Sequence, residues 1–113
     1  MEECIFCKIV NKEIKANVVY EDEKVMAFYD INPQAPFHVL LIPKKHISTL
    51  LDIEEDKILI SEMMVKIKDI VEKIGISKSG FRTVINCGKD AGMDIFHLHI
   101  HILGGRRLSW PPG

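Results

Sequence analysis

Residues 97–105 of the chain read HLHIHILGG, and the rest of the sequence is best interpreted outward from this stretch. Successive side chains of an extended strand point to opposite faces of a sheet. The spacing therefore predicts His97, His99 and His101 on one face and aliphatic residues on the other. The chain has only five histidines in 113 residues. Three of them at strict period two indicate a built site, in which imidazole can act as nucleophile, proton donor or metal ligand.

Upstream of this stretch the sequence predicts an α+β fold: a five-stranded antiparallel sheet with one long helix and a short N-terminal helix. The short helix is expected at residues 5–11. The long helix is expected at residues 54–74, with Asp52 and Glu55 at capping-box spacing before it and Gly75 ending it. We expect strands at residues 18–20, 25–30, 38–42, 81–87 and 97–103.

Length and composition indicate one domain over residues 1–113 with a single core. A net charge of −1, with 27% charged residues of both signs, gives no general attraction to nucleic acid or to an anionic membrane. Any phosphate must therefore be held locally. The apolar runs are shorter than the roughly 18 residues of a membrane helix, and the acidic first residues do not match a signal peptide, so we expect a cytoplasmic protein.

Cys4 and Cys7 form a C-x-x-C pair near the N-terminus. In a reducing compartment such a pair is a metal-ligand pair or a redox motif rather than part of a disulfide framework. Two histidines would complete a tetrahedral Cys₂His₂ zinc site, although the spacing does not say which two. The redox interpretation is weaker because the motif does not follow the first strand of a βαβ unit. The third cysteine, Cys87, is expected to pack as a small apolar residue.

The central histidine of the row, His99, is the favoured nucleophile. Its Nε2 can attack a phosphorus atom if a backbone carbonyl or another histidine holds the Nδ1–H. His38, at the head of another expected strand, would complete the set. The loop GKDAG offers backbone N–H groups to an anion, and Asn86 offers an amide to a ribose or phosphate oxygen, although both features are also common turn chemistry.

Taken with the upstream stretch DINPQAPFHVLLIPKKHI and the closing LGGRRLSWPPG, the histidine row resembles the histidine triad (HIT) family, specifically its Hint branch of purine nucleoside phosphoramidases. The resemblance runs from Cys4 to Gly113. It implies an α+β fold in which two chains pair into one ten-stranded sheet. It also implies hydrolysis of purine nucleoside 5′-phosphoramidates, of the AMP-lysine type, and of aminoacyl adenylates.

The resemblance implies roles for single residues. His99 would be the nucleophile that is transiently nucleotidylated, His101 would contact the phosphate, and His38 and His97 would support them. Asp30 would accept hydrogen bonds from the ribose hydroxyls. The bound nucleotide would be a purine nucleotide such as AMP or GMP. Its further contacts would be Ile5, Phe6, Ile9, Phe28, Ile31, Asn86, Gly92 and Trp110.

Two further implications concern zinc and the C-terminal tail. Family members with the C-x-x-C pair hold a structural zinc, which here would bind Cys4, Cys7, His46 and His97; the chemistry itself would require no cofactor. Trp110 and the PPG segment after it match a tail that crosses to the active site of the partner chain and influences the choice of leaving group.

One position departs from the Hint pattern. A serine that contacts the phosphate or the leaving group is replaced here by Asp94. A carboxylate beside an anionic phosphate costs about 1 kcal/mol or more at partly screened distance. We hypothesise that Asp94 shifts the preference toward leaving groups that carry positive charge.

Other functions fit the same residues. A dinucleoside polyphosphate hydrolase of the related Fhit branch is the enzyme alternative, although the WPPG ending favours Hint. A nucleotide-binding regulatory protein is the alternative from another class. A zinc hydrolase with the histidine row as metal ligands is disfavoured, because a carboxylate ligand or general base near the row is missing.

Overall fold

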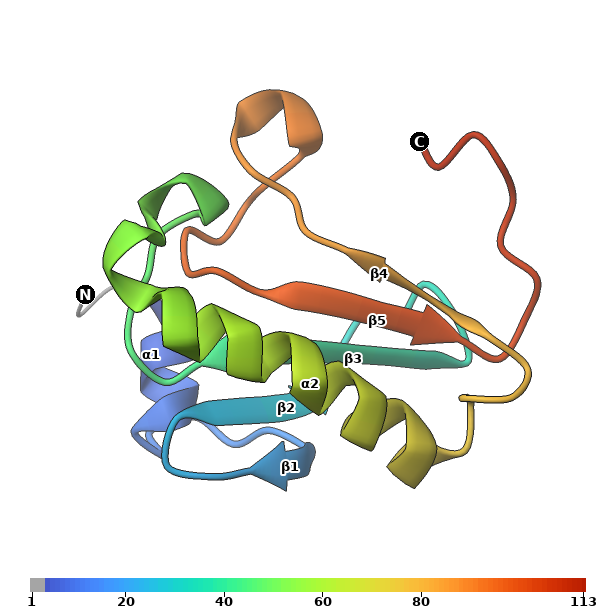
Figure 1. The fold of residues 1–113 in the computed structure, drawn as a ribbon, viewed down its shortest axis with the longest axis horizontal. Coiled ribbons are helices and arrows are strands. Elements are labelled where there is room, and N and C mark those ends of the chain that lie inside the picture. The colour runs from blue at the N-terminus through green and yellow to red at the C-terminus, as the bar shows by residue number, and fades with distance from the viewer. Residues whose placement is uncertain (1–3) are drawn as a thin grey trace.

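The computed structural model describes residues 4–113. The five strands form one antiparallel sheet in the order β1-β2-β3-β5-β4. This confirms the predicted α+β fold with one long and one short helix (Figure 1). The elements are α1 (Ile5–Val10), β1 (Val18–Glu21), β2 (Val25–Tyr29), β3 (Phe37–Pro43), α2 (Lys57–Ile74), β4 (Phe81–Val84) and β5 (Ile100–Gly104), with short 3₁₀ turns at Leu50–Asp52, Glu54–Asp56 and Lys89–Ala91.

The two faces of the sheet are covered by different helices. Alternate residues of β2 and β3, such as Val25 and Leu41, pack with the buried side of α2. The residues between them, such as Met26 and Leu40, pack with Phe6 of α1 instead. Figure 1 shows α2 running across the front of the sheet, with α1 behind it. Because both faces are buried, β2 and β3 consist almost entirely of apolar residues, and His38 is the exception in β3.

The start of α2 differs from the sequence prediction. The helix begins at Lys57, and its N-cap Asp56 makes no capping hydrogen bond with its side chain. The capping box is formed earlier, by Thr49 and Asp52, at the first 3₁₀ turn. The predicted pair of Asp52 and Glu55 was therefore wrong, because a 3₁₀ turn, rather than the first turn of α2, follows Asp52. The predicted end is confirmed, since Gly75 closes α2 in the left-handed conformation (φ 83°).

The histidine row only partly lies on a strand. β5 begins at Ile100, so His97 and His99 precede it in an irregular segment, and the predicted start at residue 97 was wrong. The alternation nevertheless persists, because Ile100 and Ile102 join the core under α2. The three histidines are thus left on the face of the sheet that α1 covers.

The outer strand β4 is shorter than the predicted 81–87 and forms one edge of the sheet. It pairs with β5 along its length, from Phe81 opposite Gly104 to Val84 opposite His101. Its other side has no strand partner among residues 4–113. No helix in this part of the chain is both long and apolar enough to span a membrane.

Candidate active site and metal centre

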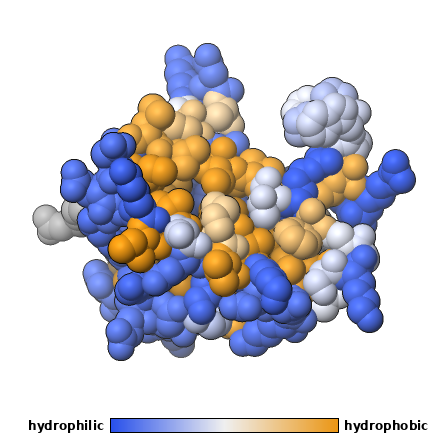
Figure 2. Space-filling model, viewed as in Figure 1, coloured by the Kyte–Doolittle hydropathy of each residue, from blue (hydrophilic) through white to orange (hydrophobic). Residues whose placement is uncertain are grey.

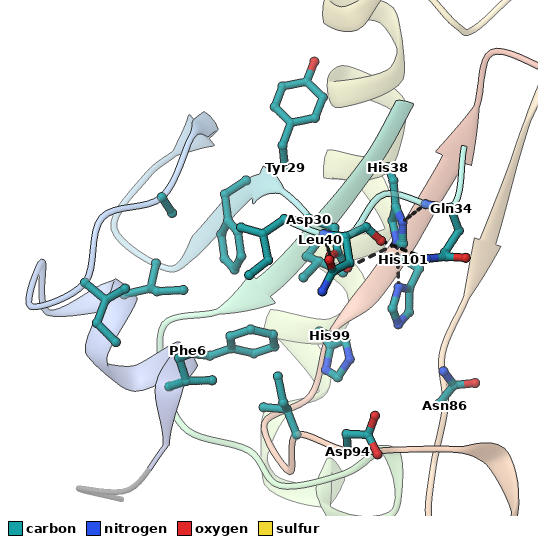
Figure 3. Close-up of a pocket in the computed structure, with 18 of the residues that line it drawn as sticks. Phe6, Tyr29, Asp30, Gln34, His38, Leu40, Asn86, Asp94, His99 and His101 are labelled. Carbon is teal, nitrogen blue, oxygen red and sulfur yellow. Dashed lines mark hydrogen bonds and ion pairs between the residues drawn. The ribbon is translucent and has the colours of Figure 1, made fainter. Parts of the chain in front are cut away.

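A cavity of about 440 Å³ lies on the α1 side of the sheet, at the ends of β3 and β5 (Figure 3). One end has apolar walls from α1 and β2, and the other is lined by histidines and by polar side chains from the loops. This volume and this mixture of walls are typical of a site for a small organic ligand. The predicted site residues that line it are Ile5, Phe6, Ile9, Phe28, Asp30, Ile31, His38, Asn86, Gly92, Asp94, His99 and His101.

His99 is held with one ring nitrogen bonded and the other free to react. Its Nδ1 lies 2.7 Å from the carbonyl oxygen of His97. Because a carbonyl only accepts, Nδ1 carries the proton and Nε2 keeps its lone pair. The ring is buried and stands edge-on to Phe6, with 5.1 Å between the ring centroids. This is the tautomer that a nucleophilic histidine needs.

His38 and His101 form a second, linked pair. The backbone N–H of Gln34 donates to His38 Nδ1 (3.0 Å), so the His38 proton must sit on Nε2. That Nε2 lies 2.9 Å from His101 Nδ1 and donates to it. Because Nδ1 of His101 accepts this bond, the single N–H proton of the neutral His101 ring is on Nε2. The pair thus presents His101 to the cavity as a hydrogen-bond donor.

Burial keeps this pair uncharged at neutral pH. Burial, together with the neighbouring His99 and His38, lowers the pKa of His101 to about 4. Burial also lowers the pKa of His38, against the opposing effect of Asp30, whose Oδ2 lies 3.5 Å from His38 Nε2. The His38–His101 contact is therefore a hydrogen bond between neutral rings.

Asp30, His38 and His101 lie close enough together to be considered as metal ligands, with ligand atoms within 4.8 Å of one another. The hydrogen bonding disfavours this use. A metal on His38 Nε2 would have to displace the proton that Gln34 fixes there, and the ring would become an imidazolate. The arrangement fits an oriented proton donor better than a cation site.

A separate cluster has the chemistry of a zinc centre. The ligand atoms of Cys4, Cys7, His46 and His97 all lie within 4.8 Å of one another. His97 Nε2 donates to the Pro43 carbonyl (2.8 Å), which leaves the Nδ1 lone pair facing the thiols, 3.4 Å from Cys4 Sγ. Burial and the neighbouring Cys4 raise the pKa of the Cys7 thiol, so two thiolates side by side need a cation between them. The donor set and its orientation fit zinc.

The sequence model of the HIT domain family matches residues 11–108 of this chain. The chain belongs to the HIT family. It is similar to an uncharacterised HIT-like protein of Synechocystis sp., with 51% identity over 99% of this chain and 98% of that protein. It is also similar to a 14 kDa zinc-binding protein of Zea mays, with 48% identity over 96% of this chain and 87% of the Zea mays protein. The crystal structure of a HIT family hydrolase from Legionella pneumophila superposes with a TM-score of 0.95 at 46% identity, covering 98% of this chain and 100% of that one.

Two residues that were predicted for the catalytic and nucleotide site of this HIT protein lie outside the cavity. His97 is fully buried and faces the cysteines, and it reaches the active site only through its carbonyl. Trp110 is 80% exposed in the C-terminal tail, where the Arg82 guanidinium lies 5.9 Å from its ring centroid. Within one chain, therefore, Trp110 is not part of the HIT cavity.

The loop before β5 was predicted to offer backbone N–H groups to an anion. At its end, the N–H groups of Gly92 and Met93 bond within the loop, to the carbonyls of Lys89 and Gly88 respectively, so these two are not free for an anion. For the N–H groups at the start of the loop the role stays a prediction. The loop also brings Asp94 to the cavity, where Figure 3 draws it on the opposite side of His99 from Asp30.

Sequence reasoning missed several residues of the HIT cavity. Leu40 and Met93 add to its walls, and among residues 4–113 Lys15 is the single lysine or arginine that lines it. Gln34 matters most, because its backbone N–H sets the tautomer of His38. No side-chain pattern could have revealed a contact made by the main chain.

Proposed function

We propose that this HIT protein is a nucleotide hydrolase that cleaves the P–N bond of purine nucleoside 5′-phosphoramidates through a nucleotidyl intermediate on His99. The observation that carries the proposal is the hydrogen bond from His99 Nδ1 to the His97 carbonyl, which leaves Nε2 as the nucleophile. The relative from Legionella pneumophila, described as a HIT family hydrolase, supports the hydrolytic part.

The first step forms a bond between His99 Nε2 and the α-phosphorus and breaks the P–N bond. The electron pair of that bond leaves on the amine nitrogen, which takes up a proton from solvent; the attacking water returns one proton to solvent in the second step. The His99 ring becomes positively charged. Its Nδ1–H remains hydrogen-bonded to the His97 carbonyl oxygen, and the dipole of that carbonyl stabilises the charge. In the second step water attacks phosphorus, which releases the nucleoside monophosphate and restores His99. One water is consumed per turnover.

The other lining residues divide between phosphate, sugar and base. His101 donates from Nε2 to a phosphate oxygen, and Asn86 offers its amide to the phosphate and ribose. Asp30 uses one carboxylate oxygen to accept the N–H of Asn32 (2.8 Å) and has lone pairs left for the ribose hydroxyls. Phe6, Phe28 and the isoleucines of the apolar end hold the purine by stacking, a contact that accepts adenine or guanine.

We propose that zinc binds at Cys4, Cys7, His46 and His97. The name of the Zea mays relative, a zinc-binding protein, supports this assignment, as does the orientation of the ligand atoms. When bound, zinc supplies a structural cross-link between α1 and the segment that carries the histidines. The proposed hydrolysis involves no metal, because His99 itself is the nucleophile.

We also propose that two chains pair through β4 into a ten-stranded sheet. The free side of β4 can accept a partner strand. On the β4 side of α2, apolar side chains are partly exposed: Leu50 (37%) and Met64 (46%) line one small hollow together with Ile85, which follows β4. Figure 2 shows hydrophobic side chains gathered on this face of the molecule, with a rim of hydrophilic residues. A partner chain would cover that patch.

Replacing His99 by Ala should abolish release of AMP from adenosine 5′-phosphoramidate. We expect a loss of at least about a thousandfold in kcat, because the nucleophile is removed. Wild-type turnover should survive a chelator. Calorimetric titration with AMP is the control, since an intact cavity still binds the product. A folded wild type that binds AMP without turning over the phosphoramidate would contradict the proposal and favour a regulatory nucleotide-binding protein.

Replacing Cys7 by Ser should weaken zinc binding by about a hundredfold or more, because a thiolate supplies a large share of the roughly 10–16 kcal/mol typical of a structural zinc site. Competition with a chromophoric chelator measures the affinity, and thermal unfolding measures the stabilisation. Cys87→Ser is the matched control, since Cys87 lies outside the cluster. Equal zinc affinities for the two variants would rule out the assigned ligands.

Replacing Asp94 by Ser should reduce the preference for cationic leaving groups. A charge interaction of about 1 kcal/mol corresponds to an approximately fivefold change in the ratio of kcat/KM for amines with and without a positive charge. The ratio is measured with two nucleoside phosphoramidates that differ only in that charge. Asp90→Ser controls for net charge, because Asp90 lies in the same loop but does not line the cavity. Identical ratios in wild type and Asp94→Ser would remove this role.

The mass of the full chain in solution, measured by sedimentation equilibrium, should be that of a dimer. Met64→Glu should shift it toward the monomer, because Met64 lies on the β4 side of α2 and a carboxylate there would be buried in the proposed interface. The side chain is exposed in the single chain, so the fold should tolerate the change. A wild-type monomer at all accessible concentrations would contradict the pairing.

A further inference from the structure

The tautomer of His38 depends on a hydrogen bond from the loop between β2 and β3. His38 Nδ1 accepts from the backbone N–H of Gln34, which lies in the exposed loop between β2 and β3. Within the loop, Asn32 N–H bonds to the Asp30 side chain, and the Gln34 side chain bonds to the Asn32 carbonyl. These contacts fix the shape of the loop, but they do not tie Gln34 to the rest of the protein.

Arg106 supplies that tie from the other end of the chain. Its Nη2 donates to the Gln34 carbonyl oxygen (2.8 Å), and its Nη1 donates to the Arg107 carbonyl (3.1 Å), which holds the guanidinium in place. The guanidinium thus connects the segment that follows β5 to the residue that donates to His38.

Gly105 makes the close approach of the two segments possible. It has φ +92°, and a Cβ at this position would lie 2.8 Å from Cβ of Pro36 and 2.9 Å from Cδ2 of Phe37. The backbone after β5 can therefore lie directly against the loop, which brings Arg106 within reach of Gln34.

A continuous series of hydrogen bonds then leads from Arg106 to the cavity. It passes through Gln34 to His38 Nδ1 and from His38 Nε2 to His101 Nδ1 (2.9 Å). If Gln34 moved away, the proton of His38 could transfer to Nδ1. The His38 Nε2 lone pair would then require a proton on His101 Nδ1, and His101 would present a lone pair instead of an N–H to a phosphate oxygen.

We propose that Arg106 is a positioning residue of the active site: by holding Gln34 it keeps His38 in its Nε2–H form and His101 as a donor toward the bound phosphate. Arg106 is exposed and does not line the cavity, so it acts without touching the substrate. The effect on turnover rests on the function proposed above, whereas the effect on the histidines does not.

The kinetic experiment compares Arg106→Ala, Arg106→Lys and Arg107→Ala in the full chain with adenosine 5′-phosphoramidate. Arg106→Ala should lower kcat about fivefold with little change in KM, because a small displacement of a phosphate-contacting group acts mainly on the transition state. Arg106→Lys should recover part of this loss, because one ammonium N–H can still reach the carbonyl. Arg107→Ala is matched in charge and position but leaves the Gln34 contact intact, so it should match wild type.

The second measurement needs no substrate. The ¹⁵N chemical shifts of the imidazole nitrogens are measured at neutral pH. For His38 they should show a protonated Nε2 and an unprotonated Nδ1 in wild type and Arg107→Ala. In Arg106→Ala they should show a mixture of the two tautomers. Unchanged His38 shifts in Arg106→Ala would overturn the proposal, whatever the rate. A wild type without turnover, combined with altered His38 shifts in Arg106→Ala, would refute the proposed function and leave the positioning role standing.

Discussion

The carbonyl group of His97 is the constraint on which both sites depend. It accepts the Nδ1–H of His99, so its direction decides which nitrogen of His99 can react. The residue is held on several sides: its Nε2 bonds to Pro43, its Nδ1 faces the cysteines, and the next amide, that of Leu98, bonds to the Ile47 carbonyl at 2.7 Å. A peptide fixed in this way cannot turn its carbonyl away from His99. The proposed metal centre and the proposed nucleophile are thus organised by one residue.

The sheet provides the rigid base for this arrangement. The apolar residues that alternate with the last two histidines, Ile100 and Ile102, are buried under α2 together with Val39 and Leu41 from β3. A close-packed core of this kind resists small displacements of the backbone. The face toward α1 carries polar groups that would be costly to bury singly, and each of its buried histidines has a hydrogen-bond partner. The polar groups of the site therefore lie on the α1 face beside a second apolar cluster, and the core under α2 stays apolar.

Much of this could be predicted from the sequence. In an extended segment every second residue lies on the same face, so the spacing of the histidines shows which of them lie together. That argument placed His97, His99 and His101 together even though only His101 lies within a regular strand. The C-x-x-C pair indicated a metal site but could not select its histidines, since the contact of Cys4 with His97 depends on how the whole chain folds. The resemblance to the HIT family supplied that choice.

Other features were beyond sequence reasoning for physical reasons. The capping box was assigned to the wrong residues because a spacing of three is satisfied equally well by a 3₁₀ turn and by an α-helix. The roles of Gln34 and of the Pro43 carbonyl come from the main chain, which every residue possesses, so their side chains give no signal.

The contact between Cys4 and His97 has a consequence for folding. It joins residues 93 positions apart, and closing so long a loop carries an entropic cost. Phe6 and Ile9, which line the cavity, lie on the short helix that begins beside Cys4, so the ligand slot is complete only when the two ends of the chain have come together.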